Sequence, residues 1–409
     1  MTIPSQQYAG LANDSYRDIP VGVRSPPYNE RVTVEGVEYS VREHVNNART
    51  GYQGTIYQRV DSGEIVVAHR GTEQIWKDGV VTDGAMVANR TNPQADDAVA
   101  LTRRAIGYSE AYGRQGGRDA PEVTVTGHSL GGTLAQVSAH HFDLRGETFN
   151  AYGAASLDRR IPEGGNTVIN HVMAADAVSS ASPHYGQVRI YATEREMTVL
   201  NQSGYKDGRI ADALTPDLPL VAAGRSLGSH SMHNFLPVDG DGRPDRSVLN
   251  DRVAIDRAAE HQRPINNYRE DMESLRRGTT VISRGPGGLI RDGIDQIRGP
   301  LPAGEPARRE EEQSQRGRDG RRASIEDVGE RGVQLAQTER GSQQDYVSRL
   351  FEAAKSGGPD AMRTANQDLQ NSATGQAWQQ RADTEAQQLA QRDAAQQSGP
   401  AQQEAARQA

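Results

Sequence analysis

Residues 123–132 are the stretch that most constrains the fold of this chain. Val and Thr alternate at its start, which is the pattern of a β-strand with one buried face. A Gly-x-Ser-x-Gly pattern centred on Ser129 follows, and apolar residues then recur at helical spacing as far as Phe142. A strand, a sharp turn and a helix together predict a nucleophile elbow, which presents Ser129 at a helix N-terminus. There the backbone N–H groups and the helix dipole favour a developing negative charge.

The same pattern occurs a second time, around Ser226. This copy follows Pro219 and two alanines, and it leads into Gly-Ser-His instead of a periodic helix. The surrounding sequence therefore favours Ser129 over Ser226 as the nucleophile.

Composition divides the 409 residues into unlike parts. Apolar residues make up only 35% of the chain, and the shortage lies mostly in the C-terminal third. The N-terminal part retains enough apolar residues for one sizeable core. We predict a catalytic domain over 1–260, a charged Gly/Pro-rich linker with some helix over 261–324, and a polar Gln/Ala-rich helical tail over 325–409, disordered at its end.

Charge and residue usage exclude several classes of protein. A net charge of −8 argues against nucleic acid as a partner. The absence of cysteine excludes disulfides and thiolate metal sites, and it fits folding in a reducing cytoplasm. The N-terminus has neither a basic region nor an apolar core, so we predict no signal peptide. No apolar run approaches the ~18 residues of a transmembrane helix.

Strands and helices are predicted to alternate along the first half of the chain, which indicates an α/β fold with a mostly parallel sheet. The segment 64–72 is nearly continuously apolar, as expected of a strand buried on both faces, and it ends in Arg-Gly-Thr. The predicted strands lie at 51–60, 64–72, 123–126, 147–153, 167–173 and 188–192, with a hairpin at 33–41 and helices at 97–112 and 133–143.

Serine is a poor nucleophile until a histidine takes its proton, and an acid must orient that histidine. Asp176 comes just after the strand at 167–173, so we expect it at the same sheet edge as Ser129. Its non-catalytic interpretation is a helix N-cap, and Asp158 is the alternative acid.

The base is expected downstream of Asp176. His184 lies close by and runs into another strand, and His261 lies in a charged helix. The polar loop at 229–236 stands near the end of the core domain, where the last member of a triad is expected. We therefore predict His230 as the base, with His233 as the alternative.

An oxyanion hole needs two backbone donors. The N–H of Leu130 is one candidate, and Thr72, after the strand at 64–72, is the other. His128 is interpreted as a turn residue, because a direct neighbour cannot swing over Ser129.

The segment 238–245 has acidic residues two apart, like part of a calcium loop. Arg243 stands where a third oxygen ligand is needed, and no Glu closes the loop. We predict a polar turn there, with no bound metal.

Three segments together resemble the class 3 lipase family: Val-Ala-His-Arg-Gly-Thr at 67–72, Gly-His-Ser-Leu-Gly-Gly at 127–132, and the loop that contains His230. The strand at 51–58 is similar to the bacterial phospholipase A1 branch. The resemblance spans roughly residues 5–240. Residues 76–96 depart from the lidded fungal members, since they carry no strongly apolar lid helix.

The resemblance implies an α/β-hydrolase fold with an oxyanion hole at the Arg-Gly-Thr turn and its acid at Asp176. It also implies a serine carboxylic-ester hydrolase that acts on lipid acyl chains at a membrane surface, of phospholipase A1 type, without a cofactor. Ser129 would attack, His230 would transfer the proton and Asp176 would orient His230.

Two further hypotheses accompany this prediction. A phospholipase would endanger the cell that makes it, so the chain is interpreted as an antibacterial or host-directed effector exported by a specialised secretion system. The tail would then dock on a secretion adaptor, and an immunity protein would be a partner. The second hypothesis is a catalytically inactive hydrolase fold that serves as a binding module.

Overall fold

The computed structural model describes residues 3–17, 30–71, 84–117, 119–157, 159–207, 217–238, 243–276 and 302–304, without the side chains of 84–92. Thr72, Asp158, residues 76–83 of the predicted segment at 76–96, and residues 239–242 of the calcium-like loop lie outside this part. The predicted tail also lies outside it, so the division into domain, linker and tail stays a prediction.

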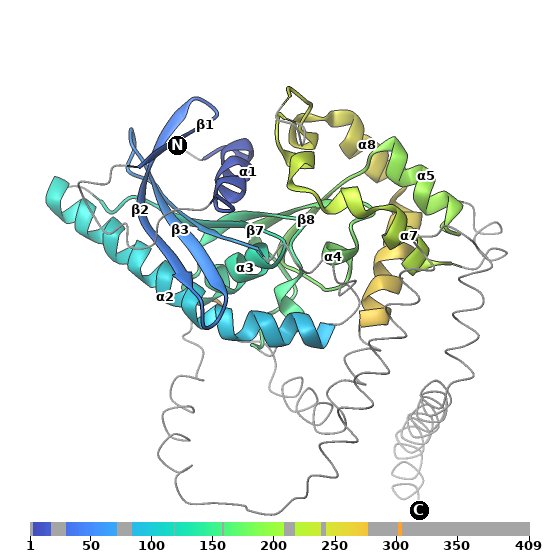
Figure 1. Ribbon diagram of the computed structural model, residues 1–409, viewed down its shortest axis with the longest axis horizontal. Coiled ribbons are helices and arrows are strands. Elements are labelled where there is room, and N and C mark those ends of the chain that lie inside the picture. The colour runs from blue at the N-terminus through green and yellow to red at the C-terminus, as the bar shows by residue number, and fades with distance from the viewer. Residues whose placement is uncertain are drawn as a thin grey trace, which may run out of the picture. The chain divides into compact units, whose positions relative to one another are not determined.

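An eight-stranded sheet forms the centre of the described part (Figure 1). The strands follow one another across the sheet in chain order. The first four pair antiparallel, and β4 to β8 pair parallel. Their bounds are β1 Arg31–Val34, β2 Val37–Asn47, β3 Tyr52–Arg59, β4 Ile65–His69, β5 Val123–His128, β6 Arg145–Phe149, β7 Gly164–Met173 and β8 Tyr185–Tyr191.

The sequence patterns explain these strands. Every residue of β4 is buried, as its continuous apolar run predicts. The turn between β1 and β2 uses Glu35 and Gly36 at φ 49° and 74°, the backbone that a tight hairpin requires. The α/β fold with a mostly parallel sheet is confirmed.

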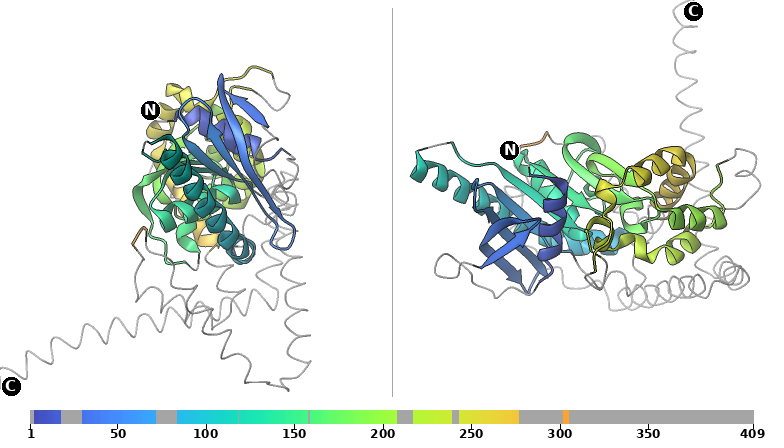
Figure 2. Two further views of the ribbon diagram at one scale, coloured as in Figure 1. Left: turned by 90° about the vertical axis from the view of Figure 1, so that its left-hand side faces the viewer. Right: turned by 90° about the horizontal axis from the view of Figure 1, so that it is seen from above.

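Helices cover both faces of the sheet (Figures 1 and 2). Helix α1 packs on one face with the buried residues Tyr39, Val66 and Phe149, whereas α2 and α3 bury Ile56, Val67 and Val125 on the other. The helices are α1 Ser5–Asp14, α2 Gly84–Gly116, α3 Leu130–Phe142, α4 Ala177–Ser180, α5 Glu194–Gln202, α7 Pro219–Arg225 and α8 Arg252–Glu260, with 3₁₀ turns η3 Ala154–Ser156, η4 Leu227–His230, η5 Met232–Phe235 and η6 Val248–Asn250. None of the helices described is both long and apolar enough to cross a bilayer.

Helix α2 is longer than the predicted 97–112. It contains Pro93, which removes one backbone hydrogen bond, so the sequence predicts an interruption of the helix there. The buried stripe that begins at Ala95 and continues through Leu101 anchors the helix just beyond the proline. Packing against the sheet therefore holds a helix that its local sequence disfavours.

A further helix over 262–276 packs against the loop that carries Asp176. Ile265, Tyr268 and Met272 are almost completely buried on it. The hydroxyl of Tyr268 donates to the carbonyl of Ala175, and the guanidinium of Arg276 donates to the carbonyl of Ala181. The start of the predicted linker thus stabilises the edge of the sheet.

We expect a chain that ends at His261 to unfold or to lose most of its stability. The three buried side chains of the 262–276 helix contribute on the order of 5–8 kcal/mol, which is comparable to the whole net stability of a typical domain. A chain that ends at Gly304 is the control, and its melting temperature should match that of the full chain. Equal melting temperatures for all three chains would show that the helix adds nothing.

Three histidines are buried as neutral groups. Burial lowers the pKa values of His69, His128 and His184 to about 3. Each ring accordingly makes neutral hydrogen bonds, such as Nε2–H of His184 to the carbonyl of Ala151 at 2.8 Å.

These histidines should make the fold sensitive to acid. The unfolded chain takes up a proton at each ring below pH ~6.5, whereas the folded chain does not until about pH 3. The unfolded state therefore binds more protons between these values, and stability falls as pH falls. Each ring should contribute a slope of up to ~1.4 kcal/mol per pH unit.

The measurement is the free energy of unfolding of wild type and His184→Gln between pH 7 and pH 5. The glutamine amide can still donate to Ala151 but cannot titrate. The slope of the free energy of unfolding against pH should therefore fall by the contribution of one ring, up to ~1.4 kcal/mol per pH unit. His233→Gln is the matched control, because His233 is exposed. An unchanged slope in His184→Gln would contradict the assignment.

Candidate active site

The turn between β5 and α3 has the backbone expected of a nucleophile elbow. Ser129 adopts φ 59° and ψ −130°, a region that non-glycine residues rarely occupy. A Cβ on Gly127 would overlap the backbone of Gly131, and one on Gly131 would overlap the carbonyl of His69. Strand, helix and neighbouring strand therefore approach too closely for any side chain at these two glycines. The second Gly-x-Ser-x-Gly pattern lacks this strain, since Ser226 has φ −109°.

Asp176 follows β7 and begins the short helix α4. Its carboxylate accepts the backbone N–H groups of Val178 and Ser179 at 3.2 and 3.0 Å, so it is an N-cap. The same carboxylate accepts Nδ1–H of His230 at 3.0 Å. Asp176 is therefore an N-cap and at the same time a hydrogen-bond partner of His230. Burial alone would raise its pKa, but His230 and the N–H of Ser179 outweigh burial and lower the pKa.

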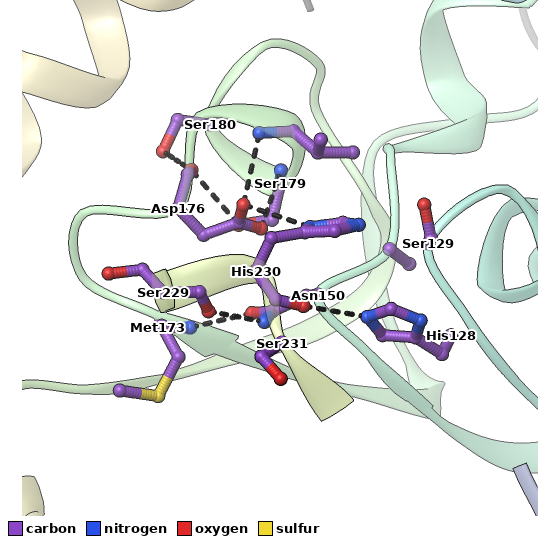
Figure 3. A network of polar contacts seen from close by, with 12 residues as sticks. His128, Ser129, Asn150, Met173, Asp176, Ser179, Ser180, Ser229, His230 and Ser231 are labelled. Atoms are coloured by element: carbon purple, nitrogen blue, oxygen red, sulfur yellow. Dashed lines mark hydrogen bonds and ion pairs between the residues drawn. The ribbon is translucent and has the colours of Figure 1, made fainter. Parts of the chain in front are cut away.

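His230 is the last residue of η4 and is buried. Because a carboxylate has no proton to give, Nδ1 must be the donor, and Nε2 of the neutral ring is then the acceptor. In Figure 3 the ring extends from Asp176 in the direction of Ser129. The alternative base, His233, is exposed on η5. The structure thus brings Asp176 and His230 together, whereas their catalytic roles stay predictions.

His128 does more than shape the turn. Its Nε2 donates to the carbonyl of His230 at 2.8 Å, and its Nδ1 accepts the hydroxyl of Tyr16 at 2.8 Å. The rings of His128 and His230 lie 4.7 Å apart between centroids. The residue before the candidate nucleophile therefore holds the backbone of the candidate base, across more than a hundred residues of chain.

Glu196 links the loop that carries Asp176 to the loop that carries His230. Its carboxylate accepts the backbone N–H of Ala175 at 3.0 Å and hydrogen-bonds the side chain of Ser229. It also forms a capping box with Thr193 on α5. Burial raises the pKa of this carboxyl, although these hydrogen bonds oppose the shift. The spacing of Thr193 and Glu196 is the one signal in the sequence that could have indicated this residue.

The backbone at the end of β4 lies against the elbow. A Cβ on Gly71 would lie 2.5 Å from the carbonyl oxygen of His128 and 3.1 Å from Cβ of Ser129. Leu130, which is buried, begins α3 on the other side of Ser129. Leu130 and Gly71 therefore flank Ser129, while Thr72 lies outside the described residues.

Metal binding has no support in the described part of the chain. No group of three or more His, Asp and Glu residues there could hold an ion. The site is instead one buried carboxylate, one imidazole and one strained serine, a set of groups suited to nucleophilic acyl transfer.

Comparison with known proteins finds several lipases among the solved structures. Among solved structures, the chain is similar to the Lip2 lipase from Yarrowia lipolytica, with 16% identity over 46% of this chain and 77% of that one and a TM-score of 0.32. It is also similar to the lipase–propeptide complex of Rhizomucor miehei, with 13% identity, 46% and 67% coverage and a TM-score of 0.31. A triacylglycerol lipase from Penicillium expansum is similar too, with 17% identity over 46% of this chain and 78% of that one and a TM-score of 0.29.

A search of curated proteins found no match. The sequence model of the phospholipase-like family, described as a Tle-like phospholipase domain, matches residues 7–214, which is half of the chain. This match contains the strained serine and the buried acid, and it ends before the loop of His230. The chain belongs to the family of Tle-like phospholipase domains.

Proposed function

We propose that the chain is a serine phospholipase of A1 type, which cleaves the sn-1 acyl ester of phospholipids through an acyl-enzyme. One observation carries the proposal: the hydrogen bond between buried Asp176 and His230 stands beside a serine in the strained backbone of an elbow. The membership in a phospholipase-like family supports the lipid substrate.

The chemistry follows from the groups present. Oγ of Ser129 attacks the ester carbonyl while Nε2 of His230 takes its proton. The imidazolium that forms is stabilised by Asp176, whose carboxylate is held in place by two backbone N–H groups of α4. The N–H groups of Leu130 and Thr72 receive the negative charge of the tetrahedral intermediate.

Collapse of this intermediate breaks the bond to the lysophospholipid, and His230 protonates the leaving oxygen. Water, deprotonated by the same ring, then attacks the acyl-enzyme. This releases the fatty acid and restores Ser129. The cycle needs no cofactor.

Ser129→Ala should reduce the hydrolysis of nitrophenyl esters by ~10⁴-fold or more, because the triad acts as a unit. His230→Ala should be equally inactive, and the double variant should be no worse. The matched controls are Ser226→Ala and His233→Ala, which should keep the wild-type rate. A fluorophosphonate probe should label Ser129 alone. Labelling of Ser226 would move the nucleophile to that serine, whereas no labelling of the folded wild type would leave the inactive binding module as the better hypothesis.

Positional preference is tested with a phospholipid that carries different acyl chains at sn-1 and sn-2. We expect the sn-1 acid and a 2-acyl lysophospholipid as first products. Release of the sn-2 acid first would contradict the A1 assignment and leave the serine chemistry intact.

We also propose that the enzyme is an exported effector whose tail at 325–409 binds a secretion adaptor, and that an immunity protein protects the producer. The support is a membrane-lipid chemistry joined to a long polar segment beyond the family match.

The wild-type chain directed to the bacterial periplasm should stop growth, and Ser129→Ala should not. A chain cut at Gly304 should keep this toxicity but lose delivery from the producing cell; unchanged delivery would remove the tail's proposed role.

A further inference from the structure

Two segments of the candidate site meet at one side chain, that of Asn150. This residue follows β6, is completely buried and adopts φ 43°. Its Nδ2 donates to the carbonyl of Ser229 at 2.7 Å, and its Oδ1 accepts the N–H of Met173 at 2.9 Å (Figure 3). The partners fix the orientation of the amide, since a carbonyl can only accept and an N–H can only donate.

The two partners of Asn150 lie close in sequence to His230 and to Asp176. Ser229 directly precedes His230, and Met173 ends β7 three residues before Asp176. The residue before Asn150 also contributes, since the carbonyl of Phe149 accepts the backbone N–H of Ser129 at 3.1 Å. Phe149 at the end of β6 and Asn150 just after it therefore contact the backbone of Ser129, of the residue before His230 and of the last residue of the strand that leads to Asp176.

We propose that Asn150 is a positioning residue, which sets the distance and angle of His230 relative to Asp176 and Ser129. The inference rests on the proposed function. Asn150 itself touches no reacting atom; it acts by fixing the carbonyl of Ser229 to the end of the acid's strand. With His128 on the next carbonyl, two successive peptide groups of the base loop are held from the carboxyl ends of β5 and β6.

The residue type fits this task closely. The position needs a donor and an acceptor on one short side chain, and it needs a residue that tolerates positive φ. Asparagine meets both demands, because its amide offers both groups and its side chain is tolerated in the left-handed region. Aspartate has the same shape but lacks the donor, and glycine keeps only the backbone.

A second donor to the same carbonyl provides a control. Nδ2 of Asn234 lies 3.1 Å from the carbonyl of Ser229, and it also bonds the carbonyls of Gly228 and Ser231. These bonds are local to the base loop and do not reach β7. Loss of Asn234 should therefore loosen the loop without uncoupling it from the acid.

The experiment compares wild type, Asn150→Asp, Asn150→Gly and Asn234→Ala, each checked for folding by its melting temperature. Esterase kcat and KM, together with the rate of fluorophosphonate labelling, are measured from pH 5.5 to pH 8.5. Displacement of a catalytic group by ~1 Å can cost 10²-fold. We therefore expect Asn150→Gly to lose about 10- to 100-fold in kcat and in the labelling rate at every pH. Asn150→Asp should show the same loss at pH 8. KM should stay within threefold of wild type in both variants. Asn234→Ala should stay within threefold of wild type throughout.

The aspartate variant also makes a specific prediction about pH. A protonated carboxyl can donate to the carbonyl of Ser229 and restore the lost bond, whereas the carboxylate repels it. The ratio of wild-type to variant rate should therefore shrink as pH falls, while the ratio for Asn150→Gly should stay flat. A general loss of stability would not produce this difference.

Three outcomes would overturn the inference: kcat of both Asn150 variants within threefold of wild type, a loss confined to KM, or an equal loss in Asn234→Ala. Should Asn150→Asp fail to fold, Asn150→Gly decides by its kcat and labelling rate. An active Ser129→Ala variant would overturn the proposed function instead, so the two failures are distinguishable.

Discussion

The hydrogen bond between Asp176 and His230 is the interaction on which the rest of the site depends. It joins residues 54 positions apart inside a buried part of the molecule, where an unpaired carboxylate would be very costly. The carboxylate is satisfied by two N–H groups of α4 and by the imidazole, and the helix over 262–276 covers the loop that carries it. Asp176 is thus held by hydrogen bonds from α4, and its loop packs against the helix over 262–276, which lies beyond the family match.

Some of the local conflicts of this structure lie at the candidate site, although Glu35, Asp143 and Arg160 adopt positive φ elsewhere. Ser129 and Asn150 both adopt positive φ, and Glu196 is a carboxylate buried with its pKa raised. Each of these features costs stability and persists only because its surroundings fix it. Their position near the hydrogen bond between Asp176 and His230 agrees with a functional site there.

Much of the sheet could be predicted because its signals are local. The buried run of β4, the alternation of β5 and the turn at Glu35 each lie within a few residues, and each formed where expected. Helix α2 extends beyond its prediction because packing offsets the effect of Pro93, which no local pattern reports. The roles of His128 and Asn150 were missed for a related reason, since their partners lie 102 and 79 positions away.

The sequence by itself determined the strand–turn–helix around Ser129 and the α/β class, and it predicted an acid and a base further along the chain. These follow from periodicity, glycine spacing and the chemistry that a weak nucleophile requires. Only the tertiary structure decided that His230 and not His233 meets Asp176, and that Asn150 bonds the base loop to the acid's strand. Such pairings depend on how loops from distant strands meet at one edge of the sheet. A sequence pattern reports neighbours along the chain, and it does not report which side chains from distant loops lie close together.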